Sequence, residues 1–516
     1  KMYLEANGEL PATIEEQSTL SEDERKFRDT SPAESPSLAD FSTYLVPTEK
    51  EGEAPTFEEP RDIRVIDPAC GSGHFLLYAF DVLERIWHQE RPDLARSEIP
   101  EKILRYNLHG VDLDMRACQL AAFNLYLKAR GRAEEEGAEN FQMPEVGIVC
   151  ADAKIANIGA ASEIFDEVAG DQPDVRDALE DILEAFEDVQ GLGSLLDVRG
   201  TLEEHFTTKE QPTLIESVEG PGSITKFLEN LHQEVAEHRN GESFMAQDLR
   251  SFLRVLVILS QDYDVSLMNP PYGSGSGMPD VVKDYVEEHY EYTPEFYINF
   301  FEVCDRLVSS DGRIGMLVPR SFMYNQSFEE FRSDFIGERG TFDFLAEFGE
   351  GILDNATVRT VGTVVRSSED NQDQEGEFFR LHDVEKSEKE DAFLNAAFVD
   401  PVDNGIKRRY TRKLSEFSHI PGYHISYWMP LSLRELYDSE SVFDADNAGV
   451  DRKSLGVVKH GATTGDNSRF IRYFWEVDSD EWAPISKGGE DAWILPRINM
   501  VSMWGKSPEI HRFDRS

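Results

Sequence analysis

The residues best suited to chemistry are Asn269, Pro270, Pro271 and Tyr272, which follow one another directly. They come immediately after Tyr263–Met268 (YDVSLM), an apolar segment that predicts a strand. Proline has a fixed φ and no N–H, and it restricts the residue before it. The Asn269 side chain and the Pro270 carbonyl would therefore be two acceptors held in one rigid geometry. The alternative is a Pro-Pro turn with no chemical role.

Two fixed acceptors suit the activation of an exocyclic aromatic amine. The lone pair of such an amine is delocalised into the ring, which makes the nitrogen a poor nucleophile. Acceptors on both of its hydrogens can pull the nitrogen toward sp³ and free the lone pair to attack an electrophilic methyl group in line. Tyr272 offers a face on which a flipped-out base could stack, and the Gly/Ser run 273–277 would let the loop close over it.

A second chemical group is the string Asp67–Phe75 (DPACGSGHF), between a predicted strand at Ile63–Asp67 and a predicted helix at His74–Glu90. Gly71 and Gly73 let the backbone come close to a ligand, and the helix N-terminus favours a carboxylate or phosphate. The string lacks the third glycine of a dinucleotide fingerprint and the GK[ST] of a P-loop. It predicts a ligand site at the carboxyl end of a strand, the alternative being a structural glycine turn.

Two further predicted strands lead to acidic residues. Asp112 ends Asn107–Asp112 and could accept both ribose hydroxyls of a nucleoside, while Asp114 would cap the next helix. Asp152 follows Val146–Cys150 and could accept from the exocyclic amine of a bound adenine. The alternatives are that Asp112 is only a helix cap and that Asp152 is an ordinary loop residue.

The elements that must position these groups alternate between strand and helix, which indicates βαβ units and a mostly parallel sheet. Later strands are expected at Arg313–Val318, Phe342–Phe348 and Val358–Arg366, the last two as a possible hairpin; further helices are expected at about Arg91–Leu104, Met115–Arg130 and Glu295–Ser309. Residues 160–260 are acidic and helical in pattern, for example at Val175–Val189, and predict an inserted helical subdomain.

The composition limits the class of protein. The chain has 516 residues, with 51 basic and 100 acidic side chains, and its formal net charge is −49. No apolar run approaches the roughly 18 residues of a membrane span, and the N-terminus carries no signal-peptide pattern. These observations argue against a membrane protein and indicate a cytoplasmic one.

The excess of acidic residues over lysine favours a protein kept soluble in a very salty cytoplasm; the alternative is an acidic protein of an ordinary cell. At molar salt the Debye length is only about 3 Å, so the net charge would not exclude DNA binding. Cys70, Cys118, Cys150 and Cys304 form no CxxC pair, so we expect buried thiols rather than a disulfide framework or a metal site.

These motifs resemble those of the class I S-adenosylmethionine-dependent DNA methyltransferases. DPACGSGHF resembles motif I, which binds the methionine part of the cofactor, and GVDLD resembles motif II, with Asp112 on the ribose. Asp152 stands where motif III holds the adenine ring. NPPY resembles motif IV of the enzymes that methylate exocyclic amines, and Asn at its head favours adenine N6 over cytosine N4. The order of motifs is the gamma arrangement.

The resemblance implies a Rossmann-like α/β methyltransferase fold. It also implies S-adenosyl-L-methionine as the cofactor, duplex DNA as the partner and no metal. The residues that would hold the cofactor are Asp67, Pro68, Ala69, Cys70, Gly71, Ser72, Gly73, Phe75, Asp112 and Asp152, and those that would hold the target base are Asn269, Pro270, Pro271 and Tyr272. Two features depart from the pattern: no Phe-x-Thr-Pro segment precedes motif I, and Leu353 stands where related enzymes carry a second stacking aromatic.

A narrower resemblance concerns the PglX-type methylases of BREX phage-defence systems, with type IIG restriction–modification methylases as near relatives. It rests on Glu98–Arg130, on the acidic insertion and on Gly461–Phe470 (GATTGDNSRF). It implies other phage-defence subunits as partners, a recognition region that begins near residue 455, and a chain that is a fragment. The expected segments are an acidic lead-in (1–60), a cofactor-binding half (61–160), the helical insertion (161–260), a catalytic half (261–370), a linker with a basic patch (371–454) and the start of the recognition domain (455–516).

Candidate phosphate contacts lie in two basic stretches near the end of the chain, for which a solvated surface is the alternative. They are Lys407, Arg408, Arg409, Arg412, Lys413, Lys459, Arg469 and Arg472. Other functions stay open: a non-catalytic DNA-recognition or scaffold subunit of a defence complex, or a methyltransferase acting on ribosomal RNA or a protein amide. A dinucleotide-dependent oxidoreductase is disfavoured by the missing third glycine and by the NPPY loop.

Overall fold

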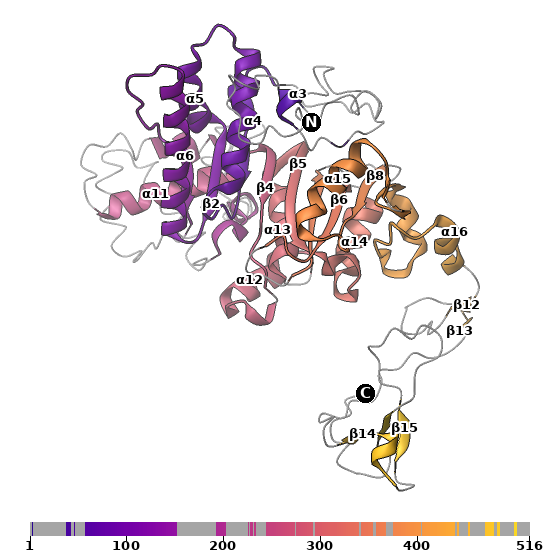
Figure 1. Ribbon diagram of the computed structural model, residues 1–516. Coiled ribbons are helices and arrows are strands. Elements are labelled where there is room, and N and C mark those ends of the chain that lie inside the picture. Colours follow the sequence, from indigo (N-terminus) through magenta and orange to yellow (C-terminus); the bar gives the residue numbers. More distant parts are fainter. Residues whose placement is uncertain are drawn as a thin grey trace. The chain divides into compact units, whose positions relative to one another are not determined.

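Strands and helices alternate along most of the chain in the computed structural model (Figure 1). The residues that the structure describes are Tyr3, 38–42, Val46, 57–151, 192–202, 225–226, 228–230, 232–233, 244–273, 275–292, 295–339, 342–353, 358–367, 375–403, 405–438, 441–442, 453–454, 470–478, 482–485 and 500–502. The chain divides into two units, Lys1–Glu435 and Leu436–Ser516.

The first unit is built on one nine-stranded sheet with the order β11-β8-β6-β7-β5-β4-β1-β2-β3. Strands β3, β2, β1, β4 and β5 are parallel neighbours, whereas β7 runs antiparallel to both β5 and β6, and β11 runs antiparallel to β8. The bounds are β1 Val65–Asp67, β2 Leu108–Asp112, β3 Gly147–Cys150, β4 Tyr263–Met268, β5 Val308–Pro319, β6 Phe342–Gly349, β7 Thr360–Arg366, β8 Glu375–Arg380 and β11 Arg409–Lys413.

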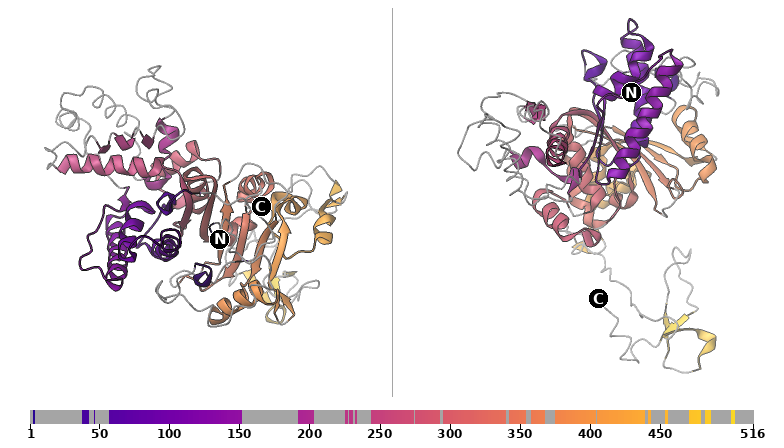
Figure 2. Two further views of the ribbon diagram at one scale, coloured as in Figure 1. Left: turned by 90° about the horizontal axis from the view of Figure 1, so that it is seen from above. Right: turned by 90° about the vertical axis from the view of Figure 1, so that its left-hand side faces the viewer.

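Helices cover both faces of this sheet (Figure 2). Successive side chains of a strand point to opposite faces, and Val65 accordingly joins a core formed with α4, α5 and α6, whereas Ile66 joins the core formed with α11 and α13. The bounds are α3 Leu38–Phe41, α4 His74–Glu90, α5 Ile99–Tyr106, α6 Met115–Glu135, α11 Phe244–Ser260, α12 Asp280–His289, α13 Phe296–Leu307, α14 Glu329–Arg332, α15 Lys389–Phe398 and α16 Leu431–Arg434. The first unit is therefore a doubly wound α/β domain with a mixed, mostly parallel sheet, as the sequence predicts.

The predicted strands of the first half are confirmed, and that at Tyr263–Met268 has the predicted bounds. Phe342–Gly349 and Thr360–Arg366 pair antiparallel, so the expected hairpin partners are also confirmed. The segment 371–454, which we expected to be a linker with a basic patch, contributes strands to the sheet of the first unit. The sheet continues past the expected catalytic half (261–370) into β8 and then into β11.

Within the predicted insertion, the described residues include α11 and the segment 192–202. The helix predicted at Val175–Val189 lies outside the described residues. In the second unit, β14 (Ile471–Tyr473), β15 (Ala483–Ile485) and β16 (Met500–Ser502) form a three-stranded antiparallel sheet, and β12 (Ser441–Val442) pairs with β13 (Lys453–Ser454). No helix among the described residues is long and apolar enough to cross a membrane.

Phe301 of α13 tests the packing between this helix and the sheet. Its side chain is 0% exposed, and its ring centroid lies 5.0 Å from that of Phe331 and 6.2 Å from that of Phe342. We expect Phe301→Ala to lower the free energy of unfolding by about 3–5 kcal/mol, because it removes buried surface and leaves a cavity. Phe123→Ala is the control, since Phe123 on α6 is 54% exposed, and it should change stability by no more than about 0.5 kcal/mol. Urea unfolding measures both; equal losses would contradict the packing described.

Candidate active site

The Asn269–Tyr272 segment leaves the carboxyl end of β4 and is held at both of its ends. The Tyr272 hydroxyl lies 2.8 Å from the Asn269 Oδ1 and 2.9 Å from the carbonyl oxygen of Leu317 on β5. The Phe296 N–H at the start of α13 donates to the Gly273 carbonyl at 3.1 Å. Asn269 is exposed, while Pro270 is buried. The loop therefore presents the Asn269 side chain at the edge of the sheet on a backbone that is tied to two neighbouring elements.

Tyr272 has a single hydroxyl hydrogen and two acceptors within reach. Burial raises the pKa of Tyr272 to about 12, so the hydroxyl stays a donor at neutral pH. When it donates to Leu317, the Asn269 Oδ1 keeps both lone pairs for another donor. The tyrosine can thus fix the loop while the Asn269 Oδ1 stays able to accept from another donor.

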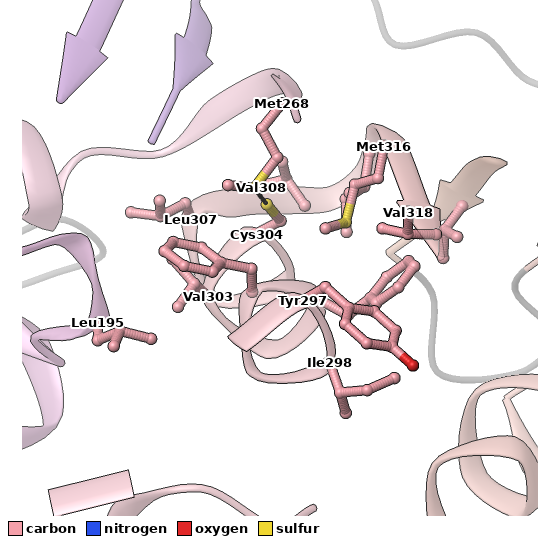
Figure 3. Close-up of a cluster of buried hydrophobic side chains, with 14 of the residues drawn as sticks. Leu195, Met268, Tyr297, Ile298, Val303, Cys304, Leu307, Val308, Met316 and Val318 are labelled. Atoms are coloured by element: carbon pink, nitrogen blue, oxygen red, sulfur yellow. Dashed lines mark hydrogen bonds between the residues drawn. The ribbon is translucent and has the colours of Figure 1, made fainter. Parts of the chain in front are cut away.

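The end of β4 that leads into this loop belongs to a buried hydrophobic cluster with residues of α13 (Figure 3). Met268, the last residue of β4, is fully buried, and the Cys304 thiol donates to its sulfur at 3.4 Å. The Ser266 hydroxyl donates to the Cys304 sulfur at 3.2 Å. Because β4 is packed in this way up to its last residue, the direction in which the chain enters the Pro-Pro turn is fixed.

The turn after β1 lies at the same edge. Ile66 is paired with Ser266 of β4, so Asp67 is level with Leu267, and the next residues of both strands leave the sheet side by side. Gly71 and Gly73 have φ of 50° and 83°, a region that favours glycine. A Cβ on Gly73 would lie 3.2 Å from that of Ala121 on α6. Glycine is needed here both for the turn and for the close approach of two helices.

Asp112 joins this turn to the end of β2. One of its carboxylate oxygens accepts from the Gly71 N–H at 2.9 Å and the other from the Asp114 N–H at 2.8 Å. Each oxygen keeps a further lone pair, so the carboxylate can also accept from a pair of hydroxyls. Asp114 caps α6 by accepting from the Arg116 N–H. The prediction that Asp114 caps this helix is confirmed, whereas the role of Asp112 as a ribose ligand stays a prediction.

The N-terminus of α4 has no side-chain cap. The residue before this 17-residue helix is Gly73, which has no side chain, so no side-chain cap hydrogen bond forms at that position in the described part of the chain. The Asn124 side chain donates to the Ser72 carbonyl at 3.0 Å and thereby holds the turn against α6. Free N–H groups at a helix start suit an anionic group such as a carboxylate.

Asp67 is 1% exposed and accepts only from the Ala69 N–H, at 3.1 Å, among the interactions of the described residues. Burial, which the negative charge of Asp112 reinforces and the Ala69 N–H partly offsets, raises the pKa of Asp67 to about 8. The side chain is therefore mostly protonated at pH 7 and would ionise if a cationic group came to lie beside it.

Two features were missed in the sequence: a support for the turn after β1, and a cluster outside the site on the same edge of the sheet. The Ser194 hydroxyl donates to the Pro68 carbonyl at 2.5 Å, and Gly193 packs against Leu113. Farther along the edge, Arg320, Tyr324, Glu347 and Trp428 gather at the carboxyl ends of β5 and β6. No local motif marks these residues, because distant segments bring them together.

Other predicted residues have mixed outcomes. Asp152, Lys459 and Arg469 lie outside the described residues. Arg408 and Arg409 are 6% and 8% exposed and are ion-paired with Asp383 and Glu377 respectively, so we no longer regard them as phosphate contacts. Those that stay candidates are Lys407 and Lys413, which are exposed, Arg412, which is half-buried over the Tyr410 ring, and Arg472 of the second unit.

Cys70, Cys118 and Cys304 are buried as predicted, whereas Cys150 is partly exposed. In the part of the chain that the structure describes, no three His, Cys, Asp or Glu side chains are grouped so that they could hold a metal ion.

Comparison with known proteins gives two family matches. The family described as "Eco57I restriction-modification methylase" matches residues 106–350, and "MmeI, DNA-methyltransferase domain" matches residues 57–152. "Adenine-specific methyltransferase BrxX" of Escherichia coli O9:H4 (strain HS) is 26% identical over 498 residues, which are 89% of this chain and 38% of that protein. "Adenine-specific methyltransferase PglX" of Lacticaseibacillus casei (strain Zhang) is 27% identical over 477 residues, 86% of this chain and 36% of that protein. The chain thus spans little more than a third of the length of these curated relatives.

Among solved structures, the chain is similar to "ATP-dependent Type ISP restriction-modification enzyme LlaBIII bound to DNA", with 14% identity, a TM-score of 0.39, and coverage of 65% of this chain and 19% of that chain. It is also similar to the M protein of the type I restriction enzyme EcoKI, with 12% identity, a TM-score of 0.31, and coverage of 62% of this chain and 44% of that chain.

The buried Asp67 predicts a pH dependence of stability. Its pKa is about 8 in the folded protein against an ordinary value of 3.8, so between about pH 4 and pH 8 the unfolded chain ionises this group while the folded one keeps the proton. The contribution of Asp67 is complete below pH 4 and declines toward pH 8 by up to about 1.4 kcal/mol per pH unit. Asp67→Asn should abolish this decline, so its stability advantage over the wild type should grow from pH 5 to pH 8 in urea unfolding.

Asp114→Asn is the matched control for Asp67. The hydrogen bonds from Arg116 lower the pKa of the exposed Asp114 to about 2, so this group is ionised in both states over most of that range. The difference between Asp114→Asn and the wild type should not change from pH 6 to pH 8. If the difference in the free energy of unfolding between Asp67→Asn and the wild type also stayed constant with pH, Asp67 would not be protonated in the folded protein.

Proposed function

Starting from the homology of most of this chain to proteins named adenine-specific methyltransferases, we propose that it transfers a methyl group from S-adenosylmethionine to adenine N6. The proposed substrate is a flipped-out base of duplex DNA, and the proposed setting is phage defence of the BREX or restriction–modification kind, in the cytoplasm. The observation that carries the proposal is the rigid Asn269–Tyr272 loop beside the turn that follows β1. It is supported by the match of residues 106–350 to a restriction-modification methylase family.

The residues at the edge fit the cofactor. The uncapped start of α4 suits the carboxylate of the methionine part, and the buried Asp67 lies next to that turn, where an ammonium group would draw off its proton. The Asp112 carboxylate, fixed by two backbone N–H groups, retains lone pairs for two ribose hydroxyls. When bound, S-adenosylmethionine supplies an electrophilic methyl group.

The catalytic loop would act on the amine of the target base. The Asn269 Oδ1 and the Pro270 carbonyl would each accept a hydrogen bond from one N–H of the amine. These two hydrogen bonds would localise the nitrogen lone pair, which is then no longer delocalised into the ring. The nitrogen forms its new bond to the methyl carbon as the carbon–sulfur bond breaks, and one amine proton then leaves to solvent. Tyr272 keeps the loop in place through Leu317 and presents its ring to the base.

Asn269→Ala tests the chemical role of the loop. It should lower kcat by about 100- to 1,000-fold, the range found when one preorganised hydrogen-bonding group at a transition state is lost. The affinity for S-adenosylmethionine, measured by calorimetry, should stay as in the wild type. The assay incubates full-length protein with unmethylated duplex DNA and labelled S-adenosylmethionine and then identifies the labelled base.

Asn140→Ala is the control for Asn269, because Asn140 is exposed between α6 and β3, and it should keep full activity. If the wild type binds the cofactor but transfers no label, the non-catalytic scaffold becomes the better reading. Label on cytosine, on RNA or on protein would refute the adenine-DNA assignment.

Two substitutions at Tyr272 separate its hydroxyl from its ring. Tyr272→Phe keeps the stacking face and loses one hydrogen bond, worth about 0.5–1.5 kcal/mol, so kcat should drop by about 2- to 13-fold. Tyr272→Ala also loses base stacking, worth about 1–3 kcal/mol, and should weaken extrusion of the base. The fluorescence of 2-aminopurine at the target position, recorded without turnover, should fall in the Ala variant and persist in the Phe variant. Equal signals in both variants would rule out stacking on this ring.

A further inference from the structure

A cluster of cations and aromatic rings lies along the carboxyl edge of the sheet, outside the cofactor turn and the Asn269 loop. The Arg320 guanidinium lies 5.7 Å from the ring centroid of Tyr324, whose ring is 5.8 Å from that of Trp428. The Arg380 guanidinium in turn lies 5.7 Å from the Trp428 ring. These four side chains, which we call the edge cluster, come from the end of β8 and from the segments that follow β5 and β11, and all four are partly exposed.

The edge cluster faces the same edge as the catalytic loop. Strand β5 is parallel to β4, and the Tyr272 hydroxyl donates to Leu317, only three residues before Arg320. Extended chain advances about 3.3 Å per residue, so the Arg320 backbone lies within about 10 Å of that contact. In the sheet, β7, β6 and β8 follow β5 in this order, and Arg380 is the last residue of β8. The cluster therefore continues outward from the point at which a target base would enter.

A buried carboxylate positions the inner end of the cluster. Glu347 on β6 is 2% exposed; its Oε1 accepts from Arg320 at 2.5 Å and its Oε2 accepts from the Tyr427 hydroxyl at 2.8 Å. His382 lies 3.8 Å from the same carboxylate. A guanidinium that shares only part of its donors with a buried carboxylate is held in orientation and keeps further donors for an outside acceptor.

The outer end of the cluster carries a cation that forms no ion pair of its own among the described residues. The neighbour of Arg380 in the register of β6 and β8 is Glu347, whose carboxylate already accepts from Arg320 and Tyr427. The chain as a whole has 100 acidic residues and 51 basic ones. An arginine over a partly exposed indole, in an otherwise acidic protein, indicates a partner with both negative charge and flat rings. Single strands and displaced nucleotides combine these two features.

We propose that the edge cluster binds the nucleotides that flank the flipped base: Arg320 and Arg380 contact their phosphates, and Trp428 or Tyr324 stacks on an exposed base face. Glu347 is the positioning residue for Arg320. This inference rests on the proposed function in that it takes DNA as the substrate, but it assigns a separate surface, with its own contribution to DNA affinity. Contacts of this kind are to the backbone and to base faces, so they raise affinity without selecting a sequence.

The test uses Arg380→Gln in the full-length protein, with Arg380→Lys as the charge-preserving variant. The dissociation constant for a fluorescent duplex with an extrahelical adenine is measured by anisotropy at several salt concentrations, without turnover. Loss of one phosphate contact should reduce the slope of log K against log salt by about 0.9, and Arg380→Gln should weaken binding by roughly 3- to 10-fold at low salt. Arg380→Lys should recover the salt slope but not the stacking on Trp428.

A second variant addresses positioning. Glu347→Gln keeps the shape of the side chain but removes the charge that orients Arg320, and it should raise KM for DNA while kcat and the affinity for S-adenosylmethionine stay as in the wild type. The melting temperature of each variant is measured as a check on folding. If Glu347→Gln proves unstable, the DNA-binding measurements on Arg380→Gln alone test the inference.

Arg130→Gln is the matched control, since Arg130 is a surface arginine of α6 paired with Glu134, and it should leave DNA binding unchanged. An Arg380→Gln protein that binds DNA with the wild-type affinity and salt slope would overturn the inference, even if the wild type methylates adenine. Conversely, if the wild type transfers no methyl group but Arg380→Gln still weakens its DNA binding, the inference stands and the proposed catalytic function fails. If Arg130→Gln weakened DNA binding as much as Arg380→Gln, the loss would reflect the change in net charge alone, and this result would also overturn the inference.

Discussion

Strand β4 lies between β1 and β5 and pairs in parallel with both, and this constraint determines the site. Parallel strands end at the same edge, so the loop that follows β4 must emerge between the turn after β1 and the chain that follows β5. The Asn269 side chain is thereby placed beside the glycines of the β1 turn without any direct bond between the two segments. Every other contact in the site refines a position that the strand order has already set.

Hydrogen bonds then remove the remaining freedom of the edge. Asp112 ties the β1 turn to β2 through two backbone N–H groups, and Tyr272 ties the loop after β4 to Leu317 of β5. Both arrangements leave acceptors unused. Such incomplete satisfaction is costly inside a core but is what an open edge needs to receive a ligand. Asp67 is the opposite case, because burial holds it protonated until a cation can compensate its charge.

The basic residues near the carboxyl edge of the sheet differ in burial and in ion pairing from those that stand out in the sequence. The basic residues that stand out in the sequence, Arg408 and Arg409, are buried in ion pairs that help to fix β11 against its surroundings. The cations that lie at the edge, Arg320 and Arg380, come from segments that carry no basic motif. A run of charges along the sequence therefore shows neither which of them face solvent nor which are already neutralised.

The sequence by itself determined the strand–helix alternation, the glycine turn after β1, the acidic end of β2 and the Asn-Pro-Pro-Tyr loop after β4, because each depends on local rules of backbone conformation and apolar periodicity. It also identified Asp114 as a helix cap, which is a contact within three residues. The tertiary structure alone decided that β8 and β11 extend the sheet, that Ser194 supports the Pro68 turn, and that Glu347 orients Arg320. These depend on pairings between segments far apart in the chain, which no local pattern encodes. Burial also belongs to this level, since the same arginine is a surface charge or a neutralised core residue according to what packs over it.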